Sequence, residues 1–184
     1  MNELSDLLQR VVDLLRQSQI PHMIAGSFAS TYYGAVRMTQ DIDIIIAPNL
    51  STLLEFIRHL PEDSYYVDEA AARDALSRRS MFNVMDMQTG WKIDFIVRKT
   101  RPFSVTEFER RQPARLFNVE TFVASPEDVI LAKLEWAAMS GSERQISDVM
   151  GMIAAKRIDL DTEYLQTWAR ELNVVELWEK CKKY

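Results

Sequence analysis

Hydrophobic residues near the start of the chain recur with the spacing of an α-helix. Between residues 3 and 18, leucines and valines lie three or four positions apart and charged residues stand between them. This spacing gathers the apolar side chains on one side and predicts an amphipathic helix. Residues 50–60 repeat the pattern with leucine and isoleucine, so we predict a second amphipathic helix there.

Two short apolar runs have the length of buried strands rather than of helices. Residues 20–25 form the first, which ends at Gly26, and residues 41–47 form the second, which ends at Pro48. The segment between them, residues 27–33, predicts a short helix. The order strand, short helix, strand therefore opens the chain after its first helix.

A hairpin is predicted farther along the chain. Residues 81–87 and 91–97 flank Gln88-Thr89-Gly90, which reads as a three-residue loop with glycine in its last position. Strand periodicity divides the second arm between two faces. One face carries Trp91, Ile93, Phe95 and Val97, and the other carries Lys92, Asp94 and Ile96.

The last third of the chain changes character. Residues 115–124 predict extended structure that is interrupted near Asn118. Ser125-Pro126-Glu127-Asp128 then combines a capping serine, a proline at the first helical position and acids in the first turn, so a helix begins there. The rest reads as helical with a break at Gly141-Ser142. We therefore predict an α/β core over residues 1–124 and a helical region over residues 125–184.

Composition adds few constraints. The 184 residues are 47% hydrophobic and 27% charged, which is typical of a globular protein and excludes a disordered or coiled-coil chain. The net charge of −5 disfavours non-specific coating of nucleic acid. No apolar stretch has the length of a membrane span, and the single cysteine, Cys181, has no intrachain partner. We expect a cytoplasmic protein without a membrane partner.

Two acids at the start of the second predicted strand carry the first chemical signal. Asp41 and Asp43 are two residues apart, so both carboxylates leave the same face of the strand. Like charges in this position repel each other, and a bound cation would relieve the repulsion. Hard oxygen ligands of this kind suit Mg²⁺ or Mn²⁺. A second Asp-x-Asp, at residues 159–161, precedes a polar helix and is interpreted as a helix cap.

A third acid in the predicted hairpin completes a set of three carboxylates. Asp94 lies in an apolar arm, which favours it over Asp86 in the facing arm as the third ligand. Its alternative role is an ordinary ion pair with Lys92, which lies two positions away on the same face.

These residues together resemble a known family. The order Gly26-Ser27, a short helix, Asp41-x-Asp43 and a later Asp94 is similar to the DNA polymerase β-like nucleotidyltransferases. More narrowly, Gly34, Arg37 and Thr39 ahead of the acid pair resemble the bacterial AbiEii-like branch, which includes toxins of toxin–antitoxin pairs. Residues 125–134 and 144–149 are similar to further segments of that branch.

The resemblance implies a fold and an activity. The fold is a mixed, mostly antiparallel sheet flanked by helices, with a helical region at the C-terminus. The activity is two-metal transfer of an NMP from an NTP to a hydroxyl of an RNA, a protein or a small molecule. The implied acceptor is tRNA or protein, and the implied further partner is a cognate antitoxin. An antibiotic is the alternative acceptor.

Roles of individual residues follow from the same resemblance. Asp41, Asp43 and Asp94 would be catalytic and would bind Mg²⁺ or Mn²⁺. The nucleotide would be bound by four further residues of the chain: Gly26, Ser27, Arg37 and Lys133. The phosphates would meet the Gly-Ser turn at a helix start.

Simpler interpretations remain open for several residues. Lys133 fits an ordinary lysine of an amphipathic helix, and Arg37 fits a tie between its loop and Asp41. Arg144 and Asp148 have the spacing of a helical ion pair, which favours a structural role. The whole chain could also be a catalytically silent nucleotide-binding or partner-binding module. A two-metal phosphohydrolase is disfavoured, because the sequence lacks the histidine-rich ligand set that such a site needs.

Overall fold

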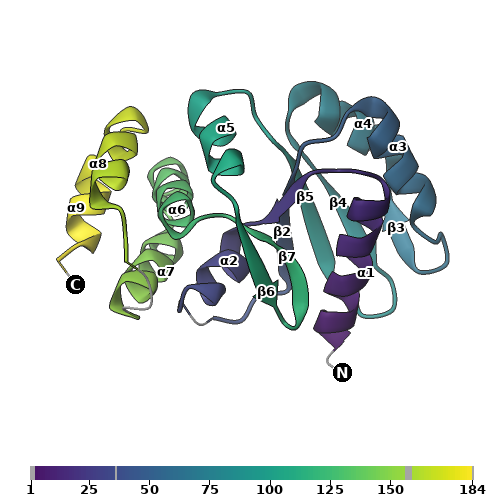
Figure 1. Ribbon diagram of the computed structural model, residues 1–184, viewed down its shortest axis with the longest axis horizontal. Coiled ribbons are helices and arrows are strands. Elements are labelled where there is room, and N and C mark those ends of the chain that lie inside the picture. Colours follow the sequence, from purple (N-terminus) through teal and green to yellow (C-terminus); the bar gives the residue numbers. More distant parts are fainter. Residues whose placement is uncertain (1–2, 36, 156–158, 184) are drawn as a thin grey trace. The chain divides into compact units, whose positions relative to one another are not determined.

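The computed structural model of the protein describes residues 3–35, 37–155 and 159–183, in which helices and strands are interspersed as far as Val123 and only helices follow (Figure 1). In chain order the elements are α1 (Glu3–Gln17), β1 (His22–Ile24), α2 (Gly26–Tyr32), β2 (Asp41–Ile46), α3 (Leu50–His59), β3 (Tyr65–Val67), α4 (Glu69–Arg78), β4 (Met81–Asp86), β5 (Lys92–Val97), α5 (Pro102–Glu109), β6 (Gln112–Leu116), β7 (Val119–Val123), α6 (Pro126–Ser140), α7 (Glu143–Ala154), α8 (Thr162–Glu171) and α9 (Val175–Cys181).

The strands of the described residues form one mixed sheet. Its order is β3-β4-β5-β2-β1-β7-β6. β2 runs parallel to β5, and β1 runs parallel to β7, whereas the other neighbouring strands pair in the antiparallel direction. The expected α/β fold with a mixed, mostly antiparallel sheet is therefore confirmed.

Strand periodicity decides which face of the sheet is buried. In β2, Ile42, Ile44 and Ile46 are fully buried, while the residues between them are partly exposed. The buried face continues on β5, where Phe95 lies against the ring of Phe56 from α3 at 5.2 Å between centroids. α3 in turn contacts α1 and α4. Asp41 and Asp43 lie on the opposite, partly exposed face of β2.

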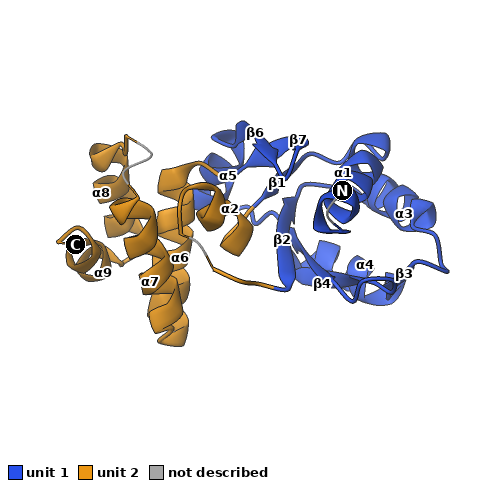
Figure 2. Cartoon of the chain, turned by 90° about the horizontal axis from the view of Figure 1, so that it is seen from below, with its two compact units in different colours: residues 1–24, 40–123 blue, residues 25–39, 124–184 orange. Residues whose placement is uncertain are grey.

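The chain divides into two compact units (Figure 2). The first comprises residues 1–24 and 40–123 and contains the whole sheet with α1, α3, α4 and α5. The second comprises residues 25–39 and 124–184 and contains α2 with α6 to α9. The prediction placed residues 25–39 in the α/β core. In the structure they group with the C-terminal helices, because α2 contacts α6 and α7.

The hairpin of β4 and β5 has a longer loop than the one that the sequence predicts. Asp86 N–H donates to the carbonyl of Trp91 at 2.9 Å, and Met85 pairs with Lys92. The loop therefore contains four residues, 87–90, and the strands pair one residue away from the register of a three-residue loop. This register places Asn83 opposite Asp94.

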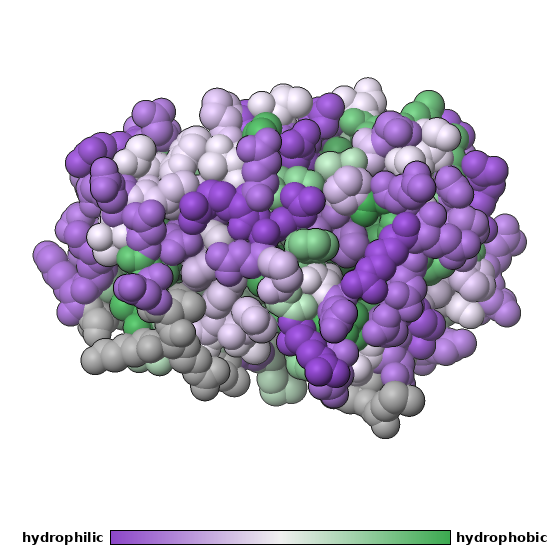
Figure 3. Space-filling view, viewed as in Figure 1, coloured by the Kyte–Doolittle hydropathy of each residue, from purple (hydrophilic) through white to green (hydrophobic). Residues whose placement is uncertain are grey.

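The surface drawn in Figure 3 is mostly hydrophilic, and apolar residues gather only in small areas of that view. Among the described residues, no helix combines the length and the apolar character that crossing a membrane requires.

His22 gives the stability of the protein a pH dependence. Its Nδ1 donates to the carbonyl of Ile20 at 3.0 Å, and its Nε2 is buried without a hydrogen bond among the described residues. Burial lowers the pKa of His22 below its usual 6.5, and the bond to Ile20 opposes this only in part. The folded protein therefore keeps the ring neutral at pH values where the unfolded chain protonates it.

Below pH 6.5 the unfolded state binds a proton that the folded state does not. We therefore expect the free energy of unfolding to decrease as the pH is lowered, with at most about 1.4 kcal/mol per pH unit from this residue. His22→Leu should flatten this slope between pH 6.5 and the lower pKa of the folded state. His59→Gln, which changes the other histidine of the chain, is the matched control. Urea titrations at several pH values measure the effect, and equal slopes for His22→Leu and the wild type would contradict it.

Candidate active site

The three predicted metal ligands lie on one face of two neighbouring strands. β2 and β5 are parallel, and their register places Asp43 directly opposite Asp94. Asp41 precedes Asp43 by two residues and pairs in register with Lys92. Because side chains alternate between the faces of a strand, all three carboxylates leave the sheet on the same side. The structure therefore brings Asp41, Asp43 and Asp94 together.

A lysine and an asparagine hold the carboxylate of Asp94. The Nζ of Lys92 lies 3.0 Å from one oxygen of Asp94 and 3.5 Å from an oxygen of Asp41. The Nδ2 of Asn83 on β4 donates to the other oxygen of Asp94 at 2.9 Å. The hydrogen bond to Asp94 raises the pKa of Lys92 above its usual value, with smaller contributions from the two nearby negative charges. An ammonium cation thus bridges two of the three acids.

Asp86, the alternative third ligand, belongs to the other face of the sheet. It lies three residues after Asn83 on β4, so the two side chains leave opposite faces of the strand, and the side chain of Asp86 is 1% exposed. Its carboxylate accepts a hydrogen bond from Arg10 of α1 at 3.0 Å. Asp94 is therefore the hairpin acid that shares a face with Asp41 and Asp43.

The donor set fits a hard divalent cation, although its side chains are not arranged as a closed cage. In the described part of the chain, no group of three or more His, Cys, Asp or Glu side chains already has the geometry that holds a metal ion. Carboxylate oxygens are nevertheless the ligands that Mg²⁺ and Mn²⁺ prefer. Lys92 shows that a positive charge is stable between Asp41 and Asp94.

The Gly-Ser turn that begins α2 belongs to the second unit. Gly26 has φ +57°, a left-handed conformation that glycine adopts without the strain a side chain would bring. Ser27 follows it and is buried, and its Oγ accepts hydrogen bonds from the guanidinium of Arg37, one of them 3.1 Å from Nε. The turn and the arginine are therefore connected through the serine hydroxyl.

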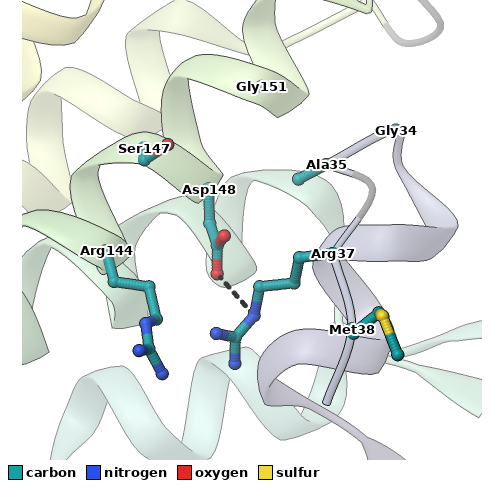
Figure 4. A pocket seen from close by; sticks show the side chains of 8 residues that line it. All are labelled: Gly34, Ala35, Arg37, Met38, Arg144, Ser147, Asp148 and Gly151. Atoms are coloured by element: carbon teal, nitrogen blue, oxygen red, sulfur yellow. Dashed lines mark ion pairs between the residues drawn. The ribbon is translucent and has the colours of Figure 1, made fainter.

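Arg37 also belongs to a buried ionic network. Its Nε lies 3.5 Å from an oxygen of Asp148 on α7 (Figure 4). The Nζ of Lys133 on α6 lies 2.7 Å from the same oxygen and donates to Oε1 of Gln145 at 3.0 Å. The side chains of Lys133 and Asp148 are only 5% and 7% exposed. Lys133 is therefore a buried, paired lysine and not a solvated one.

The start of α6 fixes where Lys133 lies. Ser125 caps the helix by accepting from the backbone N–H of Asp128 at 3.3 Å, as the sequence predicts. The carboxylate of Asp128 accepts from the hydroxyl of Ser125 at 2.6 Å and from that of Tyr164 on α8 at 2.6 Å. These bonds anchor the first turn of α6, and Lys133 follows in its second turn.

The structure thus assembles the predicted residues as two groups. Asp41, Asp43 and Asp94 lie together in the first unit. Ser27, Arg37 and Lys133 are connected in the second unit through Asp148, and Gly26 precedes Ser27.

Sequence reasoning missed Asn83 and assigned Asp148 the wrong partner. The expected helical pair of Arg144 with Asp148 does not form among the described residues, because Asp148 bonds to Lys133 and Arg37. The spacing of Lys133 and Asp148, 15 residues apart on two helices, carried no signal that periodicity could detect.

The amino-acid sequence matches no protein-family model, and the comparison with curated proteins found no match. Solved structures do resemble the chain. An antigenic nucleotidyltransferase-like protein from Paracoccidioides brasiliensis has a TM-score of 0.62 at 16% identity, covering 98% of this chain and 92% of that chain. ANT(2")-Ia in complex with adenylyl-2"-tobramycin has a TM-score of 0.61 at 12% identity, covering 94% of this chain and 98% of that chain.

The lincosamide antibiotic adenylyltransferase LnuA, solved with lincomycin bound, has a TM-score of 0.56 at 12% identity, covering 85% of this chain and 99% of that chain. Identities this low establish a shared fold and leave activity to be argued from the residues. The chain therefore has the fold of the nucleotidyltransferase-like proteins.

Proposed function

We propose that the protein is a metal-dependent nucleotidyltransferase that moves an NMP from an NTP to an acceptor hydroxyl, with cleavage of the bond between the α- and β-phosphates and release of pyrophosphate. The observation that carries the proposal is the placement of Asp41, Asp43 and Asp94 on one face of two parallel strands, with Asp43 opposite Asp94. A sheet gains nothing in stability from like charges placed directly opposite each other. A bound cation would relieve the repulsion between these carboxylates.

In this proposal Asp41 and Asp43 hold Mg²⁺ or Mn²⁺ ions, and Asp94 holds the ion on the acceptor side. Ions held there would supply positive charge for the triphosphate and for the acceptor oxygen. Asn83 fixes one oxygen of Asp94 and so leaves the other oxygen for the site. Lys92 serves as the counter-ion of the acids when no metal is bound.

The proposed nucleotide-binding residues are Gly26, Ser27, Arg37 and Lys133. Two features support this assignment: the left-handed glycine leaves the turn open to close approach, and the serine hydroxyl is bonded to a guanidinium, the group that phosphates bind most readily. Lys133 contributes positive charge from behind Asp148.

Two acceptor classes are proposed. The resemblance of the sequence to the AbiEii-like branch favours a toxin that modifies tRNA or protein and has a cognate antitoxin. The folds of ANT(2")-Ia and LnuA, whose structures contain an adenylylated or bound antibiotic, favour a small-molecule acceptor instead. Both classes place the same acids at the reacting phosphate.

Label transfer tests the activity and separates the acceptors. The protein is incubated with Mg²⁺, each of the four α-labelled NTPs and, separately, bacterial tRNA, total protein or a panel of hydroxylated antibiotics. Covalent label in one acceptor fraction supports the proposal and identifies its class. NTP binding by calorimetry without transfer to any acceptor would overturn it in favour of a silent nucleotide-binding module.

Lys92 supplies a prediction that does not depend on the acceptor. Lys92→Met removes the ammonium that a metal ion would displace, so we expect the Kd for Mn²⁺ to fall by about tenfold. Calorimetry without nucleotide measures this change.

Lys99→Met, at an exposed position just after β5, is the matched control and should bind Mn²⁺ as the wild type does. Weaker binding by Lys92→Met would show that Lys92 supports the metal site and does not compete with it.

A further inference from the structure

A polar cavity lies entirely within the second unit, at the end of α2 and beside α7 (Figure 4). Its volume is about 510 Å³, within the range of small-molecule sites. Its lining residues are Gly34, Ala35, Arg37, Met38, Arg144, Ser147, Asp148 and Gly151. Four of these eight residues are glycine, alanine or serine, and two arginines and one aspartate provide the charged groups of the wall.

The charges of the wall do not balance. Asp148 is the acid of the cavity, and its carboxylate already bonds to Arg37 and to Lys133 behind the wall. Arg144 extends into the same cavity from the first turn of α7, and Figure 4 draws no ion pair from it. Among the residues that the structure describes, Arg144 has no acidic partner. The lining thus contains two arginines and one carboxylate, and that carboxylate is already bonded to Arg37 and Lys133.

Two arginines give this cavity a specific chemistry. A guanidinium presents several N–H donors in a planar fork, which matches the oxygens of a phosphate group better than a lysine does. Arg37 is held in place by Ser27 and Asp148, with its side chain 24% exposed, so its fork is ordered before any ligand arrives. Arg144 is exposed and makes no such bond within the described ranges, and it can close on an anion from the other side.

We propose that this cavity is a phosphate-binding pocket in which Arg144 and Arg37 hold a phosphate group of a substrate. The pocket deepens the proposed function, because it rests on that function for the source of the phosphate, which is either the NTP or a nucleic-acid acceptor. Its affinity for a phosphate group does not depend on transfer. Arg144 becomes a binding residue, where its sequence spacing indicated only a structural ion pair.

Binding of inorganic pyrophosphate in the absence of metal tests the pocket. We expect Arg144→Gln to raise the Kd by about tenfold, since a hydrogen-bonded charged donor is lost, and Arg144→Lys to give a smaller loss because charge remains without the fork. Arg170→Gln, an exposed arginine of α8 in the same unit, should leave the Kd unchanged. Thermal unfolding checks that each variant is folded.

Titration with an NTP and with a short single-stranded RNA then separates the two sources of the phosphate. A loss for Arg144→Gln confined to the NTP, or confined to the RNA, supports the pocket and names its ligand. Equal pyrophosphate binding by Arg144→Gln and the wild type, or no binding by the wild type at millimolar pyrophosphate, would overturn it. An Arg144-dependent pyrophosphate site in a protein that transfers no label would remove the proposed activity and leave the pocket standing.

Discussion

Replacing Asp43 by asparagine is expected to lower NMP transfer by about a thousandfold, which corresponds to about 4 kcal/mol of lost transition-state stabilisation. Asp43 lies opposite Asp94 and two residues after Asp41, so its carboxylate adds negative charge next to both of the other proposed metal ligands. Asparagine keeps the size and a carbonyl oxygen but loses the charge that holds a divalent ion. Single-turnover transfer of labelled NMP measures the effect.

Asp159→Asn is the matched control. Asp159 opens the second Asp-x-Asp of the chain and is exposed, so its replacement should leave transfer unchanged. The thermal midpoint of Asp43→Asn should stay close to that of the wild type, because the substitution removes one of two like charges in register. Transfer by folded Asp43→Asn at the wild-type rate would remove the carboxylates from the mechanism.

Replacing Asp148 by asparagine is expected to produce the largest loss of stability among these variants, about 3 kcal/mol or more in the free energy of unfolding. The side chains of Asp148 and Lys133 are almost fully buried, and their charged atoms lie 2.7 Å apart. A neutral residue at this position would remove the carboxylate that lies 2.7 Å from the buried ammonium of Lys133. Urea denaturation measures the change.

The double variant Lys133→Met, Asp148→Asn separates a buried charge from general damage. It removes both charges, so we expect it to be more stable than Asp148→Asn alone, with a coupling of about 1 kcal/mol or more. Additive effects of the two single substitutions would show that the pair contributes little as a pair.

Local patterns predicted those parts of the fold that depend on neighbours in the sequence. Alternation separated Asp41 and Asp43 from the isoleucines of β2, and Ser125 with Pro126 marked the start of α6. The helix α4 went unpredicted because only Ala72 and Ala75 are buried on it, so its apolar face is too weak to show in the pattern.

The three acids that share one face of the sheet were predicted from the sequence, whereas the side chains that contact them were not. Asp94 could be chosen from the apolar character of its own strand. The contact of Asn83 with Asp94 could be predicted only from the correct pairing of the two hairpin strands. The loop is one residue longer than predicted, and this shift changes which β4 residues share a face with Asp94. The bond of Lys133 to Asp148 depends on how two helices pack, which sequence spacing within one helix cannot show.

Residues 25–39 leave the sheet unit after β1 and return to it at β2, so the backbone passes between the two units three times. A fragment that ends at residue 124 would contain α2 but not α6 and α7, the helices that it contacts. In such a fragment α2, whose residues Phe28 and Ala29 are buried in the structure, would lack its contacts with these helices. Truncation at this boundary is therefore unsuited to dissecting the protein, and point substitutions in the 184-residue chain are preferable.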